Sequence, residues 1–439
     1  LIQKIASLYE ASLQEKQNQK KSLTPFNDLI EEGNVRYLRP TLFDLLAHNA
    51  LNFFKSSENN IRRPAYAFEI TDEKAFSPAR EFIKTDFISQ DTGSLHLKAL
   101  QVFQELISLH LNDIKPLIDV DLERLEFVNE YAVMPDKNNL YINALKFIFE
   151  NYKDNAAAEA GYLWAMELRN NLSEVTSRHH AEQVLQSVQI LEKVIKLFPG
   201  SNGAANAENE LKNIQHPSLS VQTEKVNVIN KPFRALVSYS NIDGIYLRLI
   251  PITKKQKESI RESESSEGKK FQNMASLKPI REWKQLLPNM KDYLVHKTEI
   301  KIDGLQSGEY ILLASKDKDF STGKNLMAAN FVYISDISYV NNGRDYFVLN
   351  RNSGAAIASA EVVVFKRNYN YYTGKYSSVS IGKYRTDKNG YFQIAQNISD
   401  NLYNLQLAIN TANDQLHLDD FQRIYSYNNT FPWEDYKNQ

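Results

Sequence analysis

The stretch YRTDKNGYFQI, residues 384–394, places a polar turn between two short runs of strand-forming residues. Tyrosine, phenylalanine and isoleucine favour strands, whereas Asp387-Lys388-Asn389-Gly390 is typical of a tight turn. Gly390 can adopt a positive φ without the steric penalty that a side chain would add. The stretch therefore predicts a β-hairpin.

The sequence on both sides of this hairpin predicts a small antiparallel sandwich. Upstream, DYFVLNRNSGAAIASAEVVVF (345–365) contains two strand-like runs separated by the turn Asn352-Ser353-Gly354. Downstream, YNLQLAI (403–409) would close the sheet. Such short strands with frequent turn signals are typical of sandwich modules of roughly 80–90 residues. We expect one module over residues 336–425, and then a linker, 426–439, to a further domain.

A second sandwich is predicted directly before the first, over residues 217–335. The stretch KPFRALVSYSNIDGIYLRLIPI (231–252) contains two strands around the turn Asp243-Gly244, and apolar and polar side chains alternate along its first strand. That alternation is the pattern of a half-buried strand, and the turn predicts a hairpin.

The segment 254–271 interrupts this second sandwich with an almost wholly polar sequence. Ile260 and Phe271 are its only aliphatic or aromatic residues. Because so few apolar side chains can bury little surface, we expect a solvated insertion that is partly helical or mobile and dispensable for folding.

The first half of the chain has a different character. Residues 1–216 contain 7 of the 24 tyrosines and 5 of the 15 glycines, so strand and turn formers concentrate in the second half. Apolar residues recur with helical spacing along 42–53, where Thr41 is the expected N-cap, and along 95–111 and 184–198. We expect an α-helical domain over residues 1–215.

A weak internal repeat lies within this helical half. The stretches NYKDNAAAEA (151–160) and FPGSNGAANA (198–207) match at three alanines when they are shifted by 47 residues. Small residues at the start of a helix allow a close approach to a neighbour, as in tetratricopeptide-type hairpins. The spacing exceeds the 34 residues of that family. We therefore expect an array of helical hairpins, with two unrelated alanine-rich helices as the alternative.

The order G-x-x-I-x-x-A-x-V-x-x-F, followed by T-D-x-x-G-x-F, resembles a macroglobulin domain of the bacterial alpha-2-macroglobulin family. The stretches 36–54, 117–128 and 231–251 also resemble the N-terminal helical region and preceding domain of large Bacteroidetes members. The predicted fold class is thus α+β multidomain: an N-terminal α-helical hairpin array followed by two antiparallel β-sandwich, macroglobulin-like domains. The motif residues are Gly354, Ile357, Ala360, Val362, Phe365, Thr386, Asp387, Gly390 and Phe392.

The resemblance implies the N-terminal scaffold of a large cell-envelope protein that traps endopeptidases. Its partners would be proteases, met through the full-length protein, and an export signal or lipid anchor would lie upstream of Leu1. Family members commonly carry a bait region, and many carry a cysteine-containing thioester. This chain has no cysteine, so thioester chemistry is absent from it, and no functional residue is transferred.

Charged side chains with catalytic or metal-binding chemistry are better explained as structural. His179-His180 predicts a solvated helix start, because no third ligand is indicated. Asp119, Asp121, Glu123 and Glu126 alternate with apolar residues and predict the charged outer face of an amphipathic helix. Asp419 and Asp420 predict a loop. We find no phosphate-binding loop, nucleophile elbow or zinc motif, and we expect no enzyme activity, cofactor or metal.

The tyrosine-rich stretch RNYNYYTGKY (367–376) is the one candidate contact site. We interpret it as a polar loop, either structural or able to stack on sugar rings or a partner protein. A surface binding or adhesion module that recognises protein or glycan is therefore the alternative function. The near balance of 52 basic and 53 acidic residues favours no nucleic-acid partner. The candidate contact residues are Tyr369, Tyr371, Tyr372 and Tyr376.

Overall fold

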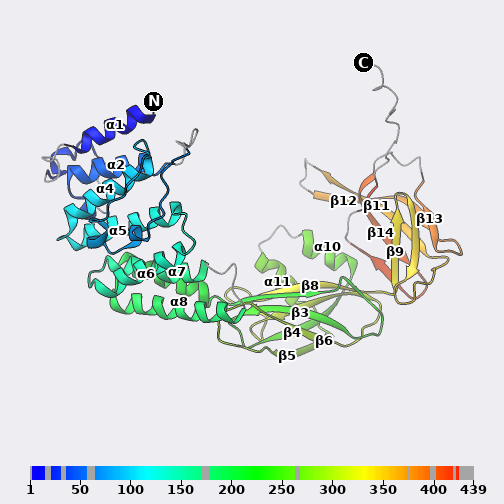
Figure 1. Ribbon diagram of the computed structural model, residues 1–439. Coiled ribbons are helices and arrows are strands. Elements are labelled where there is room, and N and C mark those ends of the chain that lie inside the picture. Colours follow the sequence, from blue (N-terminus) through cyan, green and yellow to red (C-terminus); the bar gives the residue numbers. More distant parts are fainter. Residues whose placement is uncertain are drawn as a thin grey trace, which may run out of the picture. The chain divides into compact units, whose positions relative to one another are not determined.

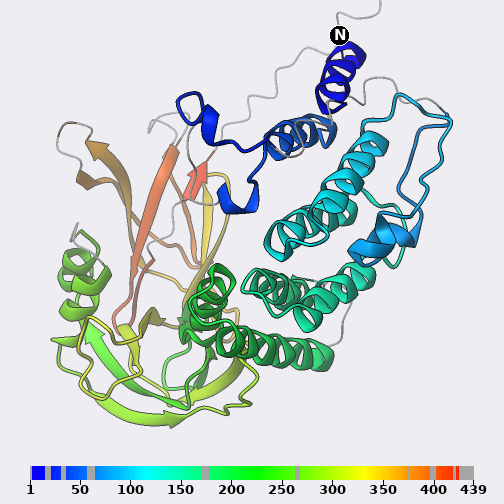
Figure 2. The same ribbon diagram turned by 90° about the vertical axis from the view of Figure 1, so that its left-hand side faces the viewer.

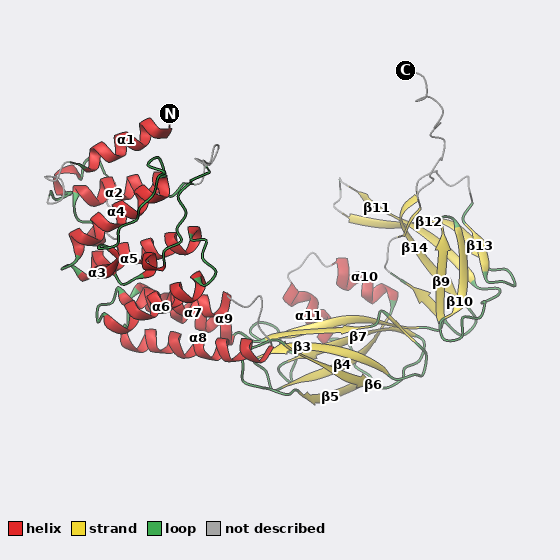
Figure 3. Ribbon diagram, viewed as in Figure 1, coloured by secondary structure: helices red, strands yellow, loops and turns green. Residues whose placement is uncertain are grey.

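The computed structural model describes residues 2–424 apart from 15–20, 31–35, 57–64, 171–176, 263–266, 371, 373–374, 396–401 and 419–421. The expected linker 426–439 and the pair Asp419-Asp420 lie outside these residues. The chain divides into two compact units, Leu1–His216 and Pro217–Gln439 (Figure 1). It has an α+β multidomain fold, with helices in the first unit and mainly antiparallel strands in the second (Figure 3).

The first unit is a stack of helices in which each helix contacts the next, except that α2 contacts α4 and the short α3 contacts η5 (Figures 1 and 2). Thr41 is the N-cap of the second helix, as predicted: its hydroxyl accepts a hydrogen bond from the backbone N–H of Asp44. The helices are α1 (Ile2–Leu13), α2 (Leu42–Phe54), α3 (Ala79–Phe82), α4 (Leu95–His110), α5 (Ile114–Tyr131), α6 (Lys137–Asn151), α7 (Ala157–Asn170), α8 (Ser177–Leu197) and α9 (Asn202–Gln215), with short 3₁₀ turns η2 (Thr24–Phe26), η3 (Arg36–Leu38) and η5 (Glu73–Phe76).

The last four helices form two successive hairpins, α6–α7 and α8–α9, and α7 contacts both α8 and α9. The expected close approach at small residues is confirmed. A Cβ on Gly203 would lie 2.4 Å from the backbone carbon of Ala158. A Cβ on Gly161 would lie 2.5 Å from the ring of Phe149 and 2.6 Å from Val194. The alanine repeat therefore marks where helix backbones touch.

The second unit begins with a two-layered, sandwich-like pair of sheets around one apolar core. All strand pairs are antiparallel except β2–β8, which is parallel. The core lies between the layers and includes Val237, Leu247 and Leu312. One layer has the order β1 (Ser218–Thr223), β3 (Phe233–Ser240), β6 (His296–Ile302), and the other β2 (Val226–Asn227), β8 (Met327–Ile334), β7 (Gly308–Ser315), β4 (Gly244–Ile252), β5 (Arg281–Leu286).

The segment 254–271 is partly helical, as expected, but the expectation that it is solvated is wrong. It forms α10 (Lys254–Glu262) and most of α11 (Glu267–Ala275), which lie against the outer face of the first sandwich. Ile260 and Met274 are buried in a cluster with Ile311 and other residues of β4 and β7. Lys257 is also buried, pairs with Glu309 and lies over the ring of Tyr333. A few apolar side chains and the buried Lys257 therefore hold the two helices against the sheet.

A second sandwich-like pair of sheets follows Ile334. Its core lies between the layers and includes Tyr346, Val362 and Leu407. The predicted strand over 403–409 forms within β14, and it pairs with the strand over 361–370. One layer has the order β13 (Tyr391–Gln393), β10 (Asp345–Asn350), β9 (Ile337–Asn342), and the other β12 (Lys375–Arg385), β11 (Glu361–Asn370), β14 (Leu402–Asn410), β15 (Gln415–His417), with β16 (Gln422–Ile424) also pairing with β14.

The stretch 384–394 forms the predicted turn but not the predicted hairpin, because β12 and β13 belong to different layers. The buried Thr386 hydroxyl donates to Ile357 O (2.7 Å) and accepts from Ala360 N (2.8 Å). Gly390, at φ 74°, donates its N–H to Asp387 O and accepts a bond from Val348 N of β10. The turn therefore carries the chain from one sheet to the other.

Two other predicted turns are sheet-to-sheet connections as well. The turn at Asp243-Gly244 joins β3 to β4, and the turn at Asn352-Ser353-Gly354 joins β10 to β11. In both cases the two strands lie in opposite layers. The turn residues specify a local reversal, whereas the partner of each strand is set by distant parts of the chain.

Asp414 fastens the two sandwiches to each other. Its Oδ1 accepts hydrogen bonds from the Ser307 hydroxyl (2.5 Å) and from Gln415 N (2.7 Å). Its Oδ2 accepts bonds from the Ser335 hydroxyl (3.0 Å) and from Asp336 N (2.8 Å). One side chain of the second sandwich thus holds both the loop before β7 and the segment that links the sandwiches.

Replacing Ile260 with alanine should destabilise the second unit by about 2–4 kcal/mol, because it leaves a cavity under α10. The free energy of unfolding can be measured by chemical denaturation followed through tryptophan fluorescence. Ser259→Ala is the matched control, since Ser259 is exposed on the same helix, and its effect should stay within about 0.5 kcal/mol. Equal stability of both variants would restore the solvated-insertion interpretation.

Candidate functional site

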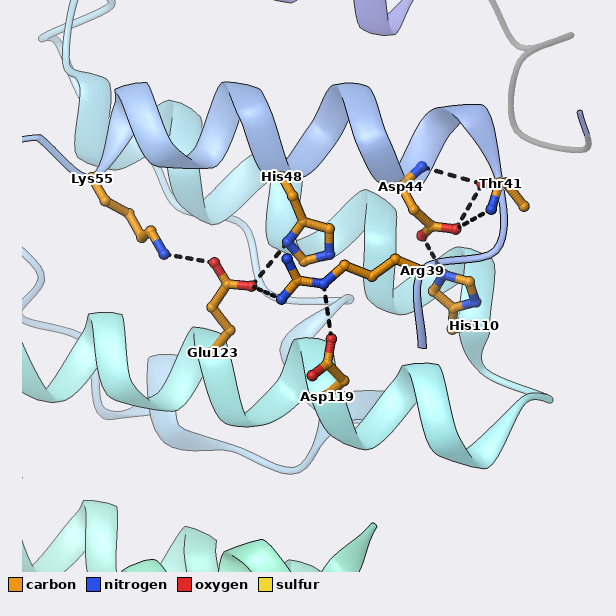
Figure 4. Close-up of polar contacts among 8 residues, drawn as sticks. All are labelled: Arg39, Thr41, Asp44, His48, Lys55, His110, Asp119 and Glu123. Atoms are coloured by element: carbon orange, nitrogen blue, oxygen red, sulfur yellow. Dashed lines mark hydrogen bonds and ion pairs between the residues drawn. The ribbon is translucent and has the colours of Figure 1, made fainter. Parts of the chain in front are cut away.

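The densest polar cluster in the helical unit joins α2, α4 and α5 (Figure 4). At its centre is the capping box of α2, in which Thr41 and Asp44 bond each other's backbone N–H groups. The Thr41 hydroxyl also donates to Asp44 Oδ2 at 2.7 Å. The sequence favours this arrangement because threonine followed three residues later by an acidic residue satisfies free N–H groups at a helix start.

Asp44 extends this cap to α4 through His110. His110 Nε2 lies 2.6 Å from Asp44 Oδ1, and both side chains are buried. Burial raises the pKa of Asp44, but the hydrogen bonds from His110 and Thr41 outweigh it, so the pKa lies below its ordinary value. Asp44 is therefore a carboxylate at neutral pH, stabilised by donors from two helices.

Glu123 on α5 is the second centre of the cluster. Lys55 Nζ lies 2.6 Å from Glu123 Oε1, while His48 Nδ1 and Arg39 Nη2 lie 2.9 Å and 3.4 Å from Oε2. Arg39 Nε also contacts Asp119 Oδ2 at 3.2 Å. Burial raises the pKa of Glu123, but His48 and then Lys55 outweigh it and lower the pKa to about 2.

The geometry of this cluster fits a structural role rather than nucleophilic catalysis. The Thr41 hydroxyl donates to Asp44, whose lowered pKa makes it a weak base, and it also accepts the backbone N–H of the helix cap. His48 and Lys55 lower the pKa of Glu123, so it is a weak base at neutral pH. The cluster therefore joins helices that are distant in sequence, and its chemistry is charge compensation.

A second buried pair lies on the opposite side of α5. Arg124 is 1% exposed, and its Nε and Nη2 donate to Asp121 Oδ1 at 3.1 Å and 2.5 Å. Its Nη1 donates to Ala75 O at 2.5 Å, and the guanidinium lies over the ring of Phe82. Arg124 thus ties the segment around η5 to α5. A cavity of about 410 Å³ lies beside the pair, between α5, α6 and η5.

The predicted charged outer face of α5 is wrong for three of its four residues. Asp121 and Glu123 point toward neighbouring segments, and Asp119 is half-buried against Arg39. Glu126 alone is exposed as expected. The amphipathic pattern places these residues off the main apolar stripe, but other helices and η5 cover that side as well.

The predicted solvated helix start at His179 is confirmed. His179 lies in the first turn of α8, its side chain is 68% exposed, and Nδ1 lies 3.8 Å from a carboxylate oxygen of Glu182. In the part of the chain that the structure describes, no three histidine or acidic side chains group as metal ligands. No helix in this described part is long and apolar enough to cross a bilayer.

The expected tyrosine loop is instead the end of a long two-stranded ribbon, since β11 continues to Asn370 and β12 begins at Lys375. Tyr369 is 42% exposed and Tyr372 is fully exposed. Tyr376 lies opposite Tyr369 in the strand register, and Tyr371 lies outside the described residues. Of the predicted contact residues, the structure therefore describes the side chains of Tyr369 and Tyr372, and both are exposed.

The sequence predicted Thr41 as a helix N-cap, but it did not predict the other polar residues that join the helices. His48, His110 and Arg124 gave no signal, because each meets a carboxylate or carbonyl only after the helices pack. Thr41 and Asp44 at capping-box spacing were the one local sign of a polar centre in this region.

No protein-family model and no curated protein matches this chain. Among solved structures, a CARDB domain from Pyrococcus furiosus matches 27% of this chain and 92% of its own, at 13% identity and a TM-score of 0.17. Red sea bream transglutaminase matches 53% of this chain and 35% of its own, at 9% identity and a TM-score of 0.23. Likenesses this weak support no statement about function.

Glu123 should make the stability of the helical unit depend on acid pH. Its pKa is about 2 in the folded chain against an ordinary 4.5, so its contribution is fully present above the ordinary value and is lost as the pH falls toward 2. The difference corresponds to about 3 kcal/mol. Helical circular dichroism in denaturant, from neutral pH to about pH 2, measures this loss.

Glu123→Gln is the control for this pH dependence. It should be less stable than the original chain at neutral pH and should show a shallower loss on acidification, since the remaining slope comes from other carboxylates such as Asp44. Parallel curves for the two proteins would contradict the assignment to Glu123.

Removing Arg124 should be costly, because it leaves the carboxylate of Asp121 buried without its partner. We expect Arg124→Met to lower the free energy of unfolding by about 3–5 kcal/mol. The double variant Asp121→Asn/Arg124→Met should recover a large part of that loss, since no charge then remains buried. A double variant no more stable than Arg124→Met would show that the loss comes from packing on Phe82 instead.

Proposed function

We propose that this chain is the N-terminal scaffold portion of a large, alpha-2-macroglobulin-like protein of the cell envelope. In this proposal the full-length protein traps endopeptidases and is held in the envelope by an anchor in another part of its sequence. The chain itself supplies spacing and docking surface, its sandwiches act as macroglobulin-like domains, and its partners are proteases engaged by the whole protein.

The observation that supports this proposal most is where the motif residues lie. Thr386 bonds the backbone of Ile357 and Ala360, while the turn from Asp387 to Gly390 bonds Val348. Residues that lie far apart in the motif thus meet at one junction between the two sheets. The motif that resembles a macroglobulin domain acts here as one structural unit.

The internal contacts are also those of a support. Asp414 links the two sandwiches, and Glu123 links α2 to α5 through compensated charges. A trap works by rearranging rigid domains after cleavage, so the domains themselves need fixed internal geometry.

A trapping assay tests this proposal. The full-length protein should slow the cleavage of a large protein substrate by an endopeptidase while leaving cleavage of a short peptide substrate almost unchanged, because a trapped protease excludes only large substrates. Residues 1–439 alone, as the matched control, should form no adduct and protect neither substrate. The proposal fails if the full-length protein protects neither substrate, or if the chain alone inhibits stoichiometrically, which would place an inhibitory element within it.

A second candidate function, surface binding, is favoured by the exposed side chains of Tyr369 and Tyr372. Aromatic side chains at the end of a ribbon can pack against protein or stack on sugar rings. In this case the sandwiches would present the ribbon, and trapping would play no part.

A further inference from the structure

The β11–β12 hairpin extends beyond the sheet to which it belongs. β14 pairs with β11 from Glu361 to Lys366, and among the described residues β11 then pairs with β12 alone as far as Asn370. Arg367 and Tyr369 therefore lie on a two-stranded ribbon (Figure 1). A two-stranded ribbon is marginally stable by itself, and an additional strand would stabilise it.

β12 is an edge strand with few features that block pairing. It pairs with β11 through a ladder that has one register shift, at Ile381, and no other described strand bonds its outer side. Residues 376–382, YSSVSIG, carry no charge and no proline. The edge strands β5 (REWKQL) and β6 (HKTEIKI) carry charges along their length instead. Charged residues and proline are the usual protection of an exposed edge, and the middle of β12 has neither.

The charge around this edge is mainly basic, although Glu361 lies opposite Arg385 in the strand register. Between Glu361 and Asp387 the sequence has five basic residues and no acidic residue, although the whole chain has a net charge of only −1. Lys383 and Arg385 are exposed on β12. Lys366 and Arg367 are half-buried on β11 and lie directly opposite Val379 and Ser378. The open edge is therefore bordered by cations.

We propose that the outer edge of β12 binds an extended, acidic segment of a partner protein as an added antiparallel or parallel strand. Alternate residues of β12 direct their N–H and C=O groups away from β11, and an extended peptide can bond them. Carboxylates of that peptide lie next to Lys383 and Arg385, and about 10 Å from Lys366 and Arg367, two strand spacings away.

A peptide fits this edge better than a glycan does. The backbone groups of an edge strand repeat every second residue, and a peptide matches that repeat with donors and acceptors alternating along its own chain. A sugar polymer can use the charges and Tyr369 but not this repeat. The proposal deepens the second candidate function, on which it rests, by naming the class of partner.

The test measures fluorescence anisotropy of labelled peptides bound to the complete 439-residue chain. The probe is a proline-free peptide of about eight alternating glutamate and valine residues, long enough to match the edge. One comparison peptide has lysine in place of glutamate, and another carries N-methyl groups on alternate residues, so that one of its edges cannot pair. We expect the glutamate peptide to bind at least about tenfold more tightly than either, and more weakly as salt increases.

Variants locate the binding on β12. Lys383→Glu/Arg385→Glu should weaken peptide binding at least about tenfold, because it replaces attraction by repulsion. Lys297→Glu/Lys301→Glu, an exposed pair on β6, is the matched control and should leave binding unchanged. Proline has no backbone N–H, so it preserves the hairpin only where the replaced amide points away from β11. Of two neighbouring residues one has such an amide, so both Ser378→Pro and Val379→Pro are made. The variant that keeps the original melting temperature should lose binding.

The outcomes separate the proposal from its alternatives. Equal binding of the N-methylated peptide, or an unchanged affinity in the Lys383→Glu/Arg385→Glu variant, would overturn edge pairing. Binding of polygalacturonate but not of the glutamate peptide would also overturn it, while leaving the surface-binding function in place. Sedimentation that shows a dimer broken by the fold-preserving proline variant would assign the edge to a second copy of the chain and overturn the acidic-peptide proposal.

Discussion

A buried polar group has to find its partners inside the protein, and this constraint shapes every part of the chain. In the helical unit, Glu123 and Arg124 are neighbours on α5 that point to different sides. Glu123 pairs with Lys55, which is distant in sequence, while Arg124 pairs with Asp121 and also donates to the distant Ala75 O. Thr386 meets the same requirement at the junction of two sheets by donating one bond and accepting another. Apolar packing supplies most of the driving force, but these partners decide which segments meet.

Signals that depend on neighbours in the sequence predicted the fold well. Thr41 caps its helix, the alanines of 157–160 mark a close helix approach, and Gly390 adopts the positive φ that its turn requires. Strand pairing was not predictable in the same way. A turn such as Asp243-Gly244 reverses the chain, but whether the next strand joins the same sheet or the opposite one depends on residues far away.

The candidate site was mostly hidden from the sequence for a related reason. Glu123 has the spacing of a solvated helix face, and only the packing of α2 against α5 turns it toward Lys55 and His48. The insertion between β4 and β5 shows the same limit from the apolar side. Counting apolar residues predicted little burial, yet Ile260 is buried and Phe271 packs against the same apolar cluster. The number of apolar residues limits how much apolar surface a segment can bury, but the positions of those residues decide whether they are buried.

The bonds to Asp414 have a mechanical consequence. A pull on the strands beyond β14 reaches this carboxylate, which bonds the Ser307 hydroxyl before β7 and the backbone of Asp336 between the sandwiches. Load is therefore shared between two routes, through the connecting segment and across the side chain. Breaking the bonds to this one carboxylate would therefore remove one of the routes by which a pull on one sandwich reaches the other.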